Sequence, residues 1–240
     1  MKDQLKYSLA GFCMGVAELI PGISGSTVAV IFKIYPNLMT ILSQLRLKNV
    51  SLNFPLIAKT FQFRVSIPLV FSMFAAILLC SNLISFLINN YEQLFLHLLG
   101  WLMMLLSIYV ADFFRASLKR FNLLIFLFLG ILIGYFLQDL NINSGEVTPL
   151  YLFISGLIAF SFFLIPGISG SAILVVLGAY SSVIQAIANL NFLFLLPFAL
   201  GCLISLFILP KIVMSLYDKY EQSLIYIFSG LIFYSGYFLL

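Results

Sequence analysis

Apolar stretches alternate with short polar joints along the whole chain. We place nine such segments, at about 5–20, 26–45, 66–89, 94–111, 121–138, 150–165, 171–190, 192–209 and 223–240. A membrane-spanning helix needs about 20 apolar residues, whereas the strands of a membrane barrel alternate residue by residue over about 10. The pattern therefore predicts an all-α integral membrane protein.

One octapeptide occurs twice in this pattern. Leu-Ile-Pro-Gly-Ile-Ser-Gly-Ser spans Leu19 to Ser26 and recurs letter for letter from Leu164 to Ser171, 145 residues later. Its Pro, Gly and Ser residues stop a helix or free its backbone groups. Broken backbone is tolerated inside a membrane only where it is packed in protein or lines a polar cavity. Paired broken segments in two halves of a chain are a sign of a transporter's central site.

The first and sixth segments, which precede the two octapeptides, are too short to span a bilayer. Roughly 16 residues reach about 24 Å as a helix, less than the ~30 Å of hydrocarbon. Each therefore suits a re-entrant hairpin that turns back near the midplane. We predict an inverted-topology repeat in which the two Pro-Gly-Ile-Ser-Gly-Ser hairpins meet there.

The predicted segments divide one transmembrane domain, residues 1–240, into two halves. Repeat one covers 1–111 and repeat two covers 150–240, with a linker helix within 112–149 between them. Four segments lie in each half and one lies in the linker. Because this odd number of segments precedes the second half, the second half is expected to be inverted relative to the first.

The charged residues support this threading. Only 8% of residues are charged and 63% are hydrophobic, which is too little polar surface for a soluble globule of this size. The joints on one side hold eleven cations: Lys2, Lys6, Arg46, Lys48, Lys59, Arg64, Arg115, Lys119, Arg120, Lys211 and Lys219. The joints on the other side hold no Lys or Arg. The positive-inside rule places the N-terminus in the cytoplasm and the C-terminus outside. The net charge of +4 is then explained by the cytoplasmic cations that are usual in a membrane protein, and no nucleic-acid partner is indicated.

The octapeptides have the chemistry of an anion site. Each leads into a predicted helix whose first N–H groups lack helical partners, and its serine hydroxyls are further donors. Phosphate is the leading ligand. The candidate binding residues are Pro21, Gly22, Ser24, Gly25, Ser26 and Thr27, together with Pro166, Gly167, Ser169, Gly170 and Ser171. The alternative is that the small residues only allow close helix packing.

Three charged residues are further candidates. Glu18 adjoins the first octapeptide, where the second half has Phe163, and Lys33 is the one Lys or Arg inside an apolar segment. Glu18 and Lys33 either neutralise each other, or Lys33 helps hold an anion while Glu18 takes up and releases a proton. The stretch 46–64 is expected to lie at the membrane surface, with a direct phosphate contact by Arg64 as the weaker alternative.

The cysteines suggest no further chemistry. Cys13, Cys80 and Cys202 all fall within apolar runs, so they indicate neither a disulfide framework nor a metal cluster. We expect no metal and no cofactor.

On these residues the sequence resembles a bacterial family, the polyprenyl-phosphate transporters called PopT. The matching pieces are Ala17 to Thr27, Tyr35, and Leu164 to Ser171 with the Leu-Gly-Ala-Tyr that ends at Tyr180. The likeness covers nearly the whole chain. The family's pattern near the C-terminus is reduced here to Tyr234–Tyr237.

The resemblance implies a flippase of the bacterial plasma membrane and not an enzyme. Such a protein returns undecaprenyl phosphate, or a similar polyprenyl phosphate, from the outer to the inner leaflet, where this lipid carrier serves cell-wall (peptidoglycan) synthesis. Membrane lipid surrounds it, and protons moving inward with the anion would offset the opposing membrane potential. The sequence leaves its oligomeric state open.

Two other functions fit parts of the sequence. A small-anion channel or exchanger would also use Gly/Ser helix starts. A polyprenyl-pyrophosphate phosphatase also has doubled Pro-Gly hairpins, but its chemistry requires an arginine in the loop and further carboxylates or a histidine nearby. Glycine stands at the middle of each Ser-Gly-Ser here, at Gly25 and Gly170, and the one nearby acid is Glu18.

Overall fold

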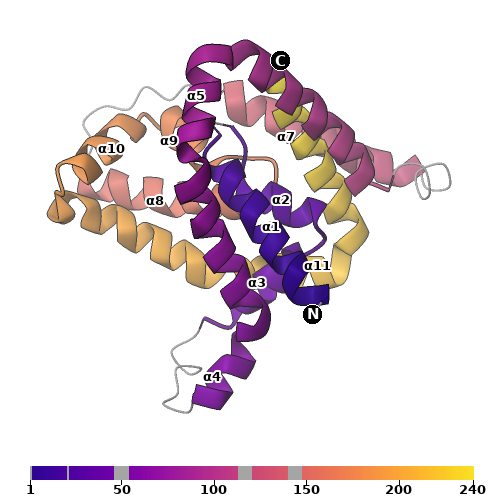
Figure 1. Ribbon diagram of the computed structural model, residues 1–240, viewed down its shortest axis with the longest axis horizontal. Coiled ribbons are helices and arrows are strands. Elements are labelled where there is room, and N and C mark those ends of the chain that lie inside the picture. The colour runs from indigo at the N-terminus through magenta and orange to yellow at the C-terminus, as the bar shows by residue number, and fades with distance from the viewer. Residues whose placement is uncertain (1, 21, 46–53, 113–120, 140–147) are drawn as a thin grey trace.

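A computed structural model describes residues 2–20, 22–45, 54–112, 121–139 and 148–240, and these residues form an all-helical protein without strands (Figure 1). The helices are α1 (Lys2–Glu18), α2 (Gly25–Ile31), α3 (Tyr35–Ser43), α4 (Phe54–Thr60), α5 (Phe63–Val110), α7 (Phe121–Asp139), α8 (Pro149–Leu164), α9 (Gly170–Val176), α10 (Tyr180–Ala188) and α11 (Phe192–Phe238).

Among the described residues, two helices are long and apolar enough to cross a membrane. They are α5, with 48 residues, and α11, with 47. Each consists of two helices joined at a kink, because the backbone leaves helical geometry at Tyr91 in α5 and at Tyr220 in α11. The kink in α5 lies between the segments expected at 66–89 and 94–111, and the kink in α11 lies between those expected at 192–209 and 223–240.

Large apolar side chains on the outside of these helices fit a lipid environment. Phe71 and Leu78 of α5 are 76% and 77% exposed, and Leu193 of α11 is 83% exposed. A soluble protein would bury side chains of this size, since each contributes about 1.5–3 kcal/mol when it leaves water. The all-α membrane class predicted from the apolar pattern is confirmed.

Each segment that follows an octapeptide is divided into two short helices, α2 and α3 in the first half and α9 and α10 in the second. Lys33 separates α2 from α3 with φ of 55°, and Gly178 separates α9 from α10 with φ of 64°. At this second break the chain bends by 114°. A left-handed residue ends a helix locally, and glycine adopts this geometry without the steric penalty that lysine carries. The segments expected at 26–45 and 171–190 thus each contain two short helices.

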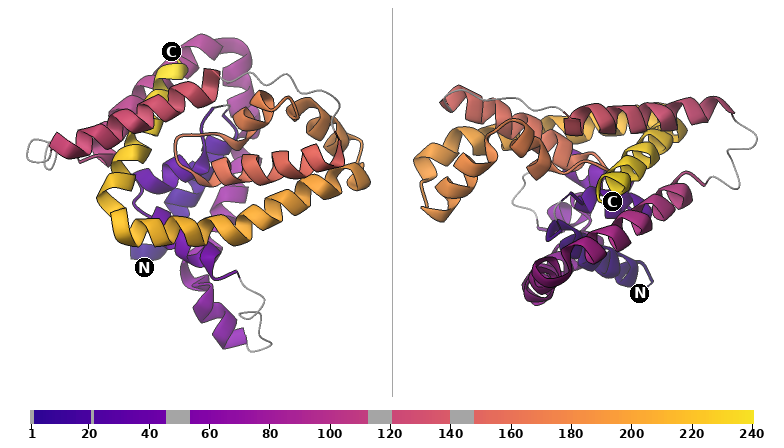
Figure 2. Two further views of the ribbon diagram at one scale, coloured as in Figure 1. Left: turned by 180° about the vertical axis from the view of Figure 1, so that it is seen from behind. Right: turned by 90° about the horizontal axis from the view of Figure 1, so that it is seen from above.

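Glycines let the short helices approach the long ones closely. A Cβ atom added to Gly11 of α1 would lie 2.2 Å from the carbonyl oxygen of Leu69 in α5, and one added to Gly156 of α8 would lie 2.2 Å from that of Phe198 in α11. Figure 2 (right) shows α1 and α5 in one layer and α8 and α11 in another. Close backbone contact at small residues is the usual mode of helix packing in membranes.

The C-terminal parts of α5 and α11 join the two layers. A Cβ atom added to Gly100 would lie 2.6 Å from the carbonyl oxygen of Gly236, and the Ser229 hydroxyl donates to the carbonyl of Ser107 at 2.6 Å. Gly100 and Ser229 are 129 residues apart, as are Ser107 and Gly236. Each residue of one contact is therefore the repeat equivalent of a residue in the other contact.

The charged stretch 46–64 is described only in part, because residues 46–53 lie outside the described residues. Its remainder contains α4 and the first residues of α5. Lys59 and Arg64 are both exposed. Its expected place at the membrane surface stays a prediction.

Candidate functional site

Both octapeptides end in the first turn of a short helix, as their Ser-Gly-Ser predicts. Ser24 is the N-cap of α2 and Ser169 is the N-cap of α9, and each helix has seven residues. Gly22 and Gly167 have φ of 86° and 83°, values that L side chains rarely adopt. Pro166 is fully buried, and Pro21 lies outside the described residues.

The structure brings the chain around the first octapeptide against the chain around the second, although 145 residues separate the two motifs. Three hydrogen bonds join these two regions: Ser24 Oγ to the Phe163 carbonyl at 3.2 Å, Gly167 N–H to Thr27 Oγ1 at 2.8 Å, and Tyr35 Oη to the Leu164 carbonyl at 3.0 Å. In these three bonds the side chain comes from the first half and the backbone group from the second.

In the first octapeptide, the serine hydroxyls and the Gly25 N–H are hydrogen-bonded to other groups of the protein. Ser24 and Ser26 are 2% and 5% exposed, with their hydroxyl oxygens 2.7 Å apart. Since Ser24 donates its proton to Phe163, the Ser26 hydroxyl is the donor of the pair. The Gly25 N–H donates to Glu18 Oε1 at 2.7 Å. The first octapeptide is therefore bonded within the protein.

The second octapeptide borders a cavity of about 530 Å³, which we call the Ser171 cavity. Ser169 and Ser171 line it, and their hydroxyl oxygens are 2.7 Å apart. This bond uses one of their two hydroxyl protons. Ser171 is exposed, whereas its counterpart Ser26 is buried. Phe163 stands where the first half has Glu18, so no equivalent carboxylate accepts from the Gly170 N–H. The donors of the second octapeptide thus face a cavity.

Most of the remaining lining of the Ser171 cavity is apolar. It includes Gly22 of the first octapeptide, Tyr180, and the hydrophobic residues Leu96, Leu137, Ile168, Ile173, Val175, Val176, Phe238 and Leu239. Among the described residues that line it, none carries a charge. An anion bound there would meet hydroxyl donors beside an apolar wall.

The structure separates the charged candidates from this cavity. Glu18 is held against Gly25, and Lys33 lines a different cavity, with its Nζ 5.2 Å from the centre of the Tyr109 ring. No ion pair joins Glu18 to Lys33 in the part of the chain that is described. Arg64 is exposed and lines neither cavity.

The sequence reasoning missed a second repeat, the tripeptide Tyr-Glu-Gln. It occurs at 91–93 and at 220–222, an offset of 129 residues, and each copy begins at the kinked tyrosine of a long helix. An alignment of the halves at the octapeptide offset of 145 does not match the two tripeptides, because the stretch between octapeptide and tripeptide is 16 residues longer in the first half. A comparison of the halves at all offsets would have found it. Glu221 and Gln222 line the same cavity as Lys33.

Comparison with known proteins agrees with the doubled motif. The model of a family described as VCA0040-like, undecaprenyl phosphate translocase-like, matches residues 14–239. A protein of Vibrio cholerae serotype O1, named polyprenyl-phosphate transporter, is 29% identical over 237 residues, which cover 95% of this chain and 75% of that protein. No solved structure matches the chain. The family resemblance drawn from the octapeptides is confirmed.

Proposed function

The chain belongs to the undecaprenyl phosphate translocase-like family, and from this premise we propose that it moves undecaprenyl phosphate, or a similar polyprenyl phosphate, from the outer to the inner leaflet of the bacterial plasma membrane. Transport of this lipid carrier would return it to cell-wall synthesis, and the protein would act as a transporter and not as an enzyme. The observation that carries the proposal is the pair Ser169 and Ser171 at the edge of a largely apolar cavity.

The serine pair suits a phosphate headgroup. Two hydroxyl oxygens 2.7 Å apart present one proton that is not used between them, and rotation of either hydroxyl aims it at the ligand. The first N–H groups of α9 lie next to them. A hydrogen bond to a charged oxygen contributes about 1.5–3 kcal/mol, more than one between neutral groups. We place the headgroup against Ser169, Gly170 and Ser171 in this conformation.

The apolar wall suits an isoprenoid tail. Leu96, Ile173 and Val176 line the Ser171 cavity, which at about 530 Å³ is larger than a phosphate needs. The first prenyl units would lie against this wall and the rest of the tail would remain in lipid. A small-anion channel or exchanger has no need of an apolar wall beside its polar groups, so the lining favours a lipid phosphate.

The two halves would form an inverted repeat with re-entrant hairpins that meet near the midplane. Three observations support this arrangement: helices recur in the same order in both halves, α1 packs on α5 as α8 packs on α11, and the contacts of α5 with α11 are reciprocal. Repeat one is 1–111, the linker helix lies within 112–149, and repeat two is 150–240. With the N-terminus in the cytoplasm, the Ser171 cavity would open to the outside.

Transport in this direction moves negative charge against an inside-negative potential. The opposing free energy is about 2.3 kcal/mol per charge for each 100 mV, so a dianion at ~100 mV faces about 4–5 kcal/mol. Protons moving inward with the lipid would offset it. Glu18 is our candidate carrier, because its carboxylate is the acid bonded to an octapeptide.

The test is flipping of a labelled polyprenyl phosphate in proteoliposomes, with chloride as competitor. Wild-type protein should move the lipid saturably and release no phosphate, and the Ser169→Ala/Ser171→Ala double variant should slow this movement at least about tenfold, since it loses the charge-assisted donor of the serine pair. Chloride flux without lipid movement would identify a small-anion carrier. Release of phosphate from a polyprenyl pyrophosphate would identify a phosphatase.

A further inference from the structure

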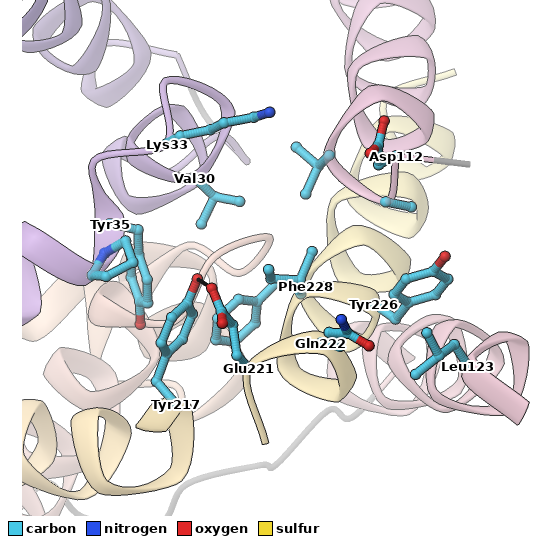
Figure 3. Close-up of a pocket in the computed structure, with 14 residues that line it drawn as sticks. Val30, Lys33, Tyr35, Asp112, Leu123, Tyr217, Glu221, Gln222, Tyr226 and Phe228 are labelled. Atoms are coloured by element: carbon cyan, nitrogen blue, oxygen red, sulfur yellow. Dashed lines mark hydrogen bonds between the residues drawn. The ribbon is translucent and has the colours of Figure 1, made fainter. Parts of the chain in front are cut away.

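A second cavity, of about 430 Å³, is lined by residues of both halves. We call it the Lys33 cavity. Its lining includes Val30, Lys33 and Tyr35 from the chain after the first octapeptide, and Tyr217 and Glu221 from α11 (Figure 3). In the close-up, Lys33 reaches from the break between α2 and α3 toward the end of α5, and Tyr217 and Glu221 rise from α11 opposite it.

The Lys33 cavity is the repeat counterpart of the Ser171 cavity. Four pairs of equivalent residues divide between them, with the member in the Lys33 cavity given first: Val30 with Val175, Tyr35 with Tyr180, Val110 with Leu239, and Ile225 with Leu96. The first two pairs are 145 residues apart and the last two 129, the offsets of the two repeated motifs. In the last pair, the second half contributes Ile225 to the Lys33 cavity and the first half contributes Leu96 to the Ser171 cavity. Each cavity is therefore built from both halves. Two unrelated hollows would not share this correspondence.

Hydrogen bonds close the Lys33 cavity off from its own octapeptide. Tyr35 is 1% exposed and donates to the Leu164 carbonyl, whereas its counterpart Tyr180 is 39% exposed. Thr27 accepts from the Gly167 N–H, whereas its counterpart Ala172 has no hydroxyl. Ser24 and Ser26 line neither cavity. The first octapeptide is thus shut away while the second is open.

The two cavities also differ in charge. Lys33, Asp112 and Glu221 line the Lys33 cavity, with the Tyr217 hydroxyl donating to Glu221 at 3.3 Å, and the residues of the Ser171 cavity are neutral. One cation with two carboxylates is a poorer environment for a phosphate than hydroxyl donors without carboxylates. The Ser171 cavity therefore suits capture of an anion and the Lys33 cavity suits its release.

We propose that the Lys33 cavity is a second access chamber for the phosphate headgroup, and that the hydrogen bond from Tyr35 to Leu164 is the latch that keeps it shut from the octapeptides. This inference rests on the proposed transport function. In the alternate conformation the repeat equivalents exchange roles: Tyr180 donates to the Leu19 carbonyl, Tyr35 turns into the Lys33 cavity, and the headgroup leaves between Lys33 and the carboxylates.

Thiol labelling in oriented vesicles tests the chamber and the latch together. In a background with Cys13, Cys80 and Cys202 replaced by Ala, the Val175→Cys and Val30→Cys variants report on the two cavities through reaction with a membrane-impermeant maleimide. We expect the two reporters to be labelled from opposite faces, Val30→Cys slowly because Val30 is 9% exposed.

Two matched tyrosine variants then test the latch: Tyr35→Phe removes its hydrogen bond, and Tyr180→Phe removes the equivalent bond of the alternate conformation. Loss of one hydrogen bond, about 1 kcal/mol, changes a two-state equilibrium about fivefold. Tyr35→Phe should therefore raise the labelling rate of the Val30→Cys reporter about fivefold, and Tyr180→Phe should lower it. Thr27→Val, which removes the second bond across the octapeptides, should act as Tyr35→Phe does and provides a second route to the result.

Labelling of both reporters from one face would overturn the chamber. An unchanged rate in both the Tyr35→Phe and Thr27→Val variants, or a rise in the Tyr180→Phe variant, would overturn the latch. Labelling requires no lipid, so its outcome is separate from that of the flipping assay. If the labelling pattern holds but polyprenyl phosphate does not move, the proposed substrate fails and the chamber stands.

Discussion

The two octapeptides are identical in sequence and differ in what surrounds them. The first is buried, with its Gly25 N–H bonded to Glu18 and its serine protons used within the protein. The second faces a cavity through Ser171. The difference arises from residues outside the motif: Glu18 against Phe163 and Thr27 against Ala172. A doubled motif therefore predicts where a site lies, and the residues around each copy decide which copy borders a cavity.

The largest effect should come from the left-handed glycines. An alanine at either Gly22 or Gly167 is strained by a positive φ, but only at Gly167 would its Cβ atom meet backbone, 2.6 Å from the Leu231 carbonyl carbon; at Gly22 the nearest atom is a Leu239 methyl at 3.3 Å. We expect Gly167→Ala to prevent accumulation of folded protein, and Gly22→Ala to lower the free energy of unfolding by about 1–3 kcal/mol. Thermal unfolding in detergent measures both. Equal losses would show that the turns are equivalent after all.

The next effect concerns Glu18, the acid that the second half lacks. Glu18→Gln keeps an oxygen that accepts from the Gly25 N–H but cannot carry a charge-neutralising proton. If one proton per cycle is lost, transport against ~100 mV should become less favourable by about 2.3 kcal/mol, or about 50-fold. Flipping under an imposed potential and proton gradient measures this, with Glu18→Ala as a control that also loses the acceptor. Unchanged transport and unchanged pH dependence in the Glu18→Gln variant would exclude Glu18 as the proton carrier.

A smaller effect should follow from giving the second octapeptide the neighbour of the first. Phe163→Glu places a carboxylate beside the Gly170 N–H, where it competes with the phosphate for the donor and repels it. We expect the affinity for a polyprenyl phosphate to fall about tenfold, the equivalent of one charge-assisted hydrogen bond. The matched control is Phe163→Gln, which removes the ring but adds no charge. If the two variants bind alike, the loss is due to packing and not to charge.

The smallest effect should come from Lys33, whose counterpart is Gly178. Lys33→Gly relieves the left-handed strain of a residue at φ of 55° but increases the freedom of the unfolded chain, so we expect the free energy of unfolding to change by less than about 1 kcal/mol. Thermal unfolding checks this expectation. Lys33→Ala, which keeps the strain, is the control and should be the less stable of the two. A large destabilisation in the Lys33→Gly variant would mean that the lysine side chain supports the fold.

Much of the fold could be predicted from the sequence because membrane helices follow directly from long apolar runs. The starts of α2 and α9 also follow locally, since Ser-Gly-Ser after Pro-Gly supplies a cap and a break. The junctions at Tyr91 and Tyr220 also follow from the sequence, because Tyr-Glu-Gln has the polarity of a joint between helices. That each junction is a kink without an intervening loop could not be predicted. The break at Lys33 could not be predicted either, because a lysine gives no signal of left-handed backbone.

The state of the site could be predicted least. The octapeptides predict its location, and the structure places the chain around the two copies in contact. Which copy is open depends on hydrogen bonds such as those from Tyr35 to Leu164 and from Gly167 to Thr27. These join segments that are distant along the chain, so no local pattern encodes them.

The most direct test of the account is equilibrium binding of a fluorescent polyprenyl phosphate to the solubilised protein, compared between two matched double variants. Ser169→Ala/Ser171→Ala should weaken binding at least about tenfold, because the open octapeptide loses its hydroxyl donors. Ser24→Ala/Ser26→Ala should change binding by less than about threefold and lower the melting temperature instead, because those hydroxyls are bonded inside the protein. Equal losses of affinity in the two variants, or a greater loss in the second, would contradict the assignment of the headgroup to the second octapeptide.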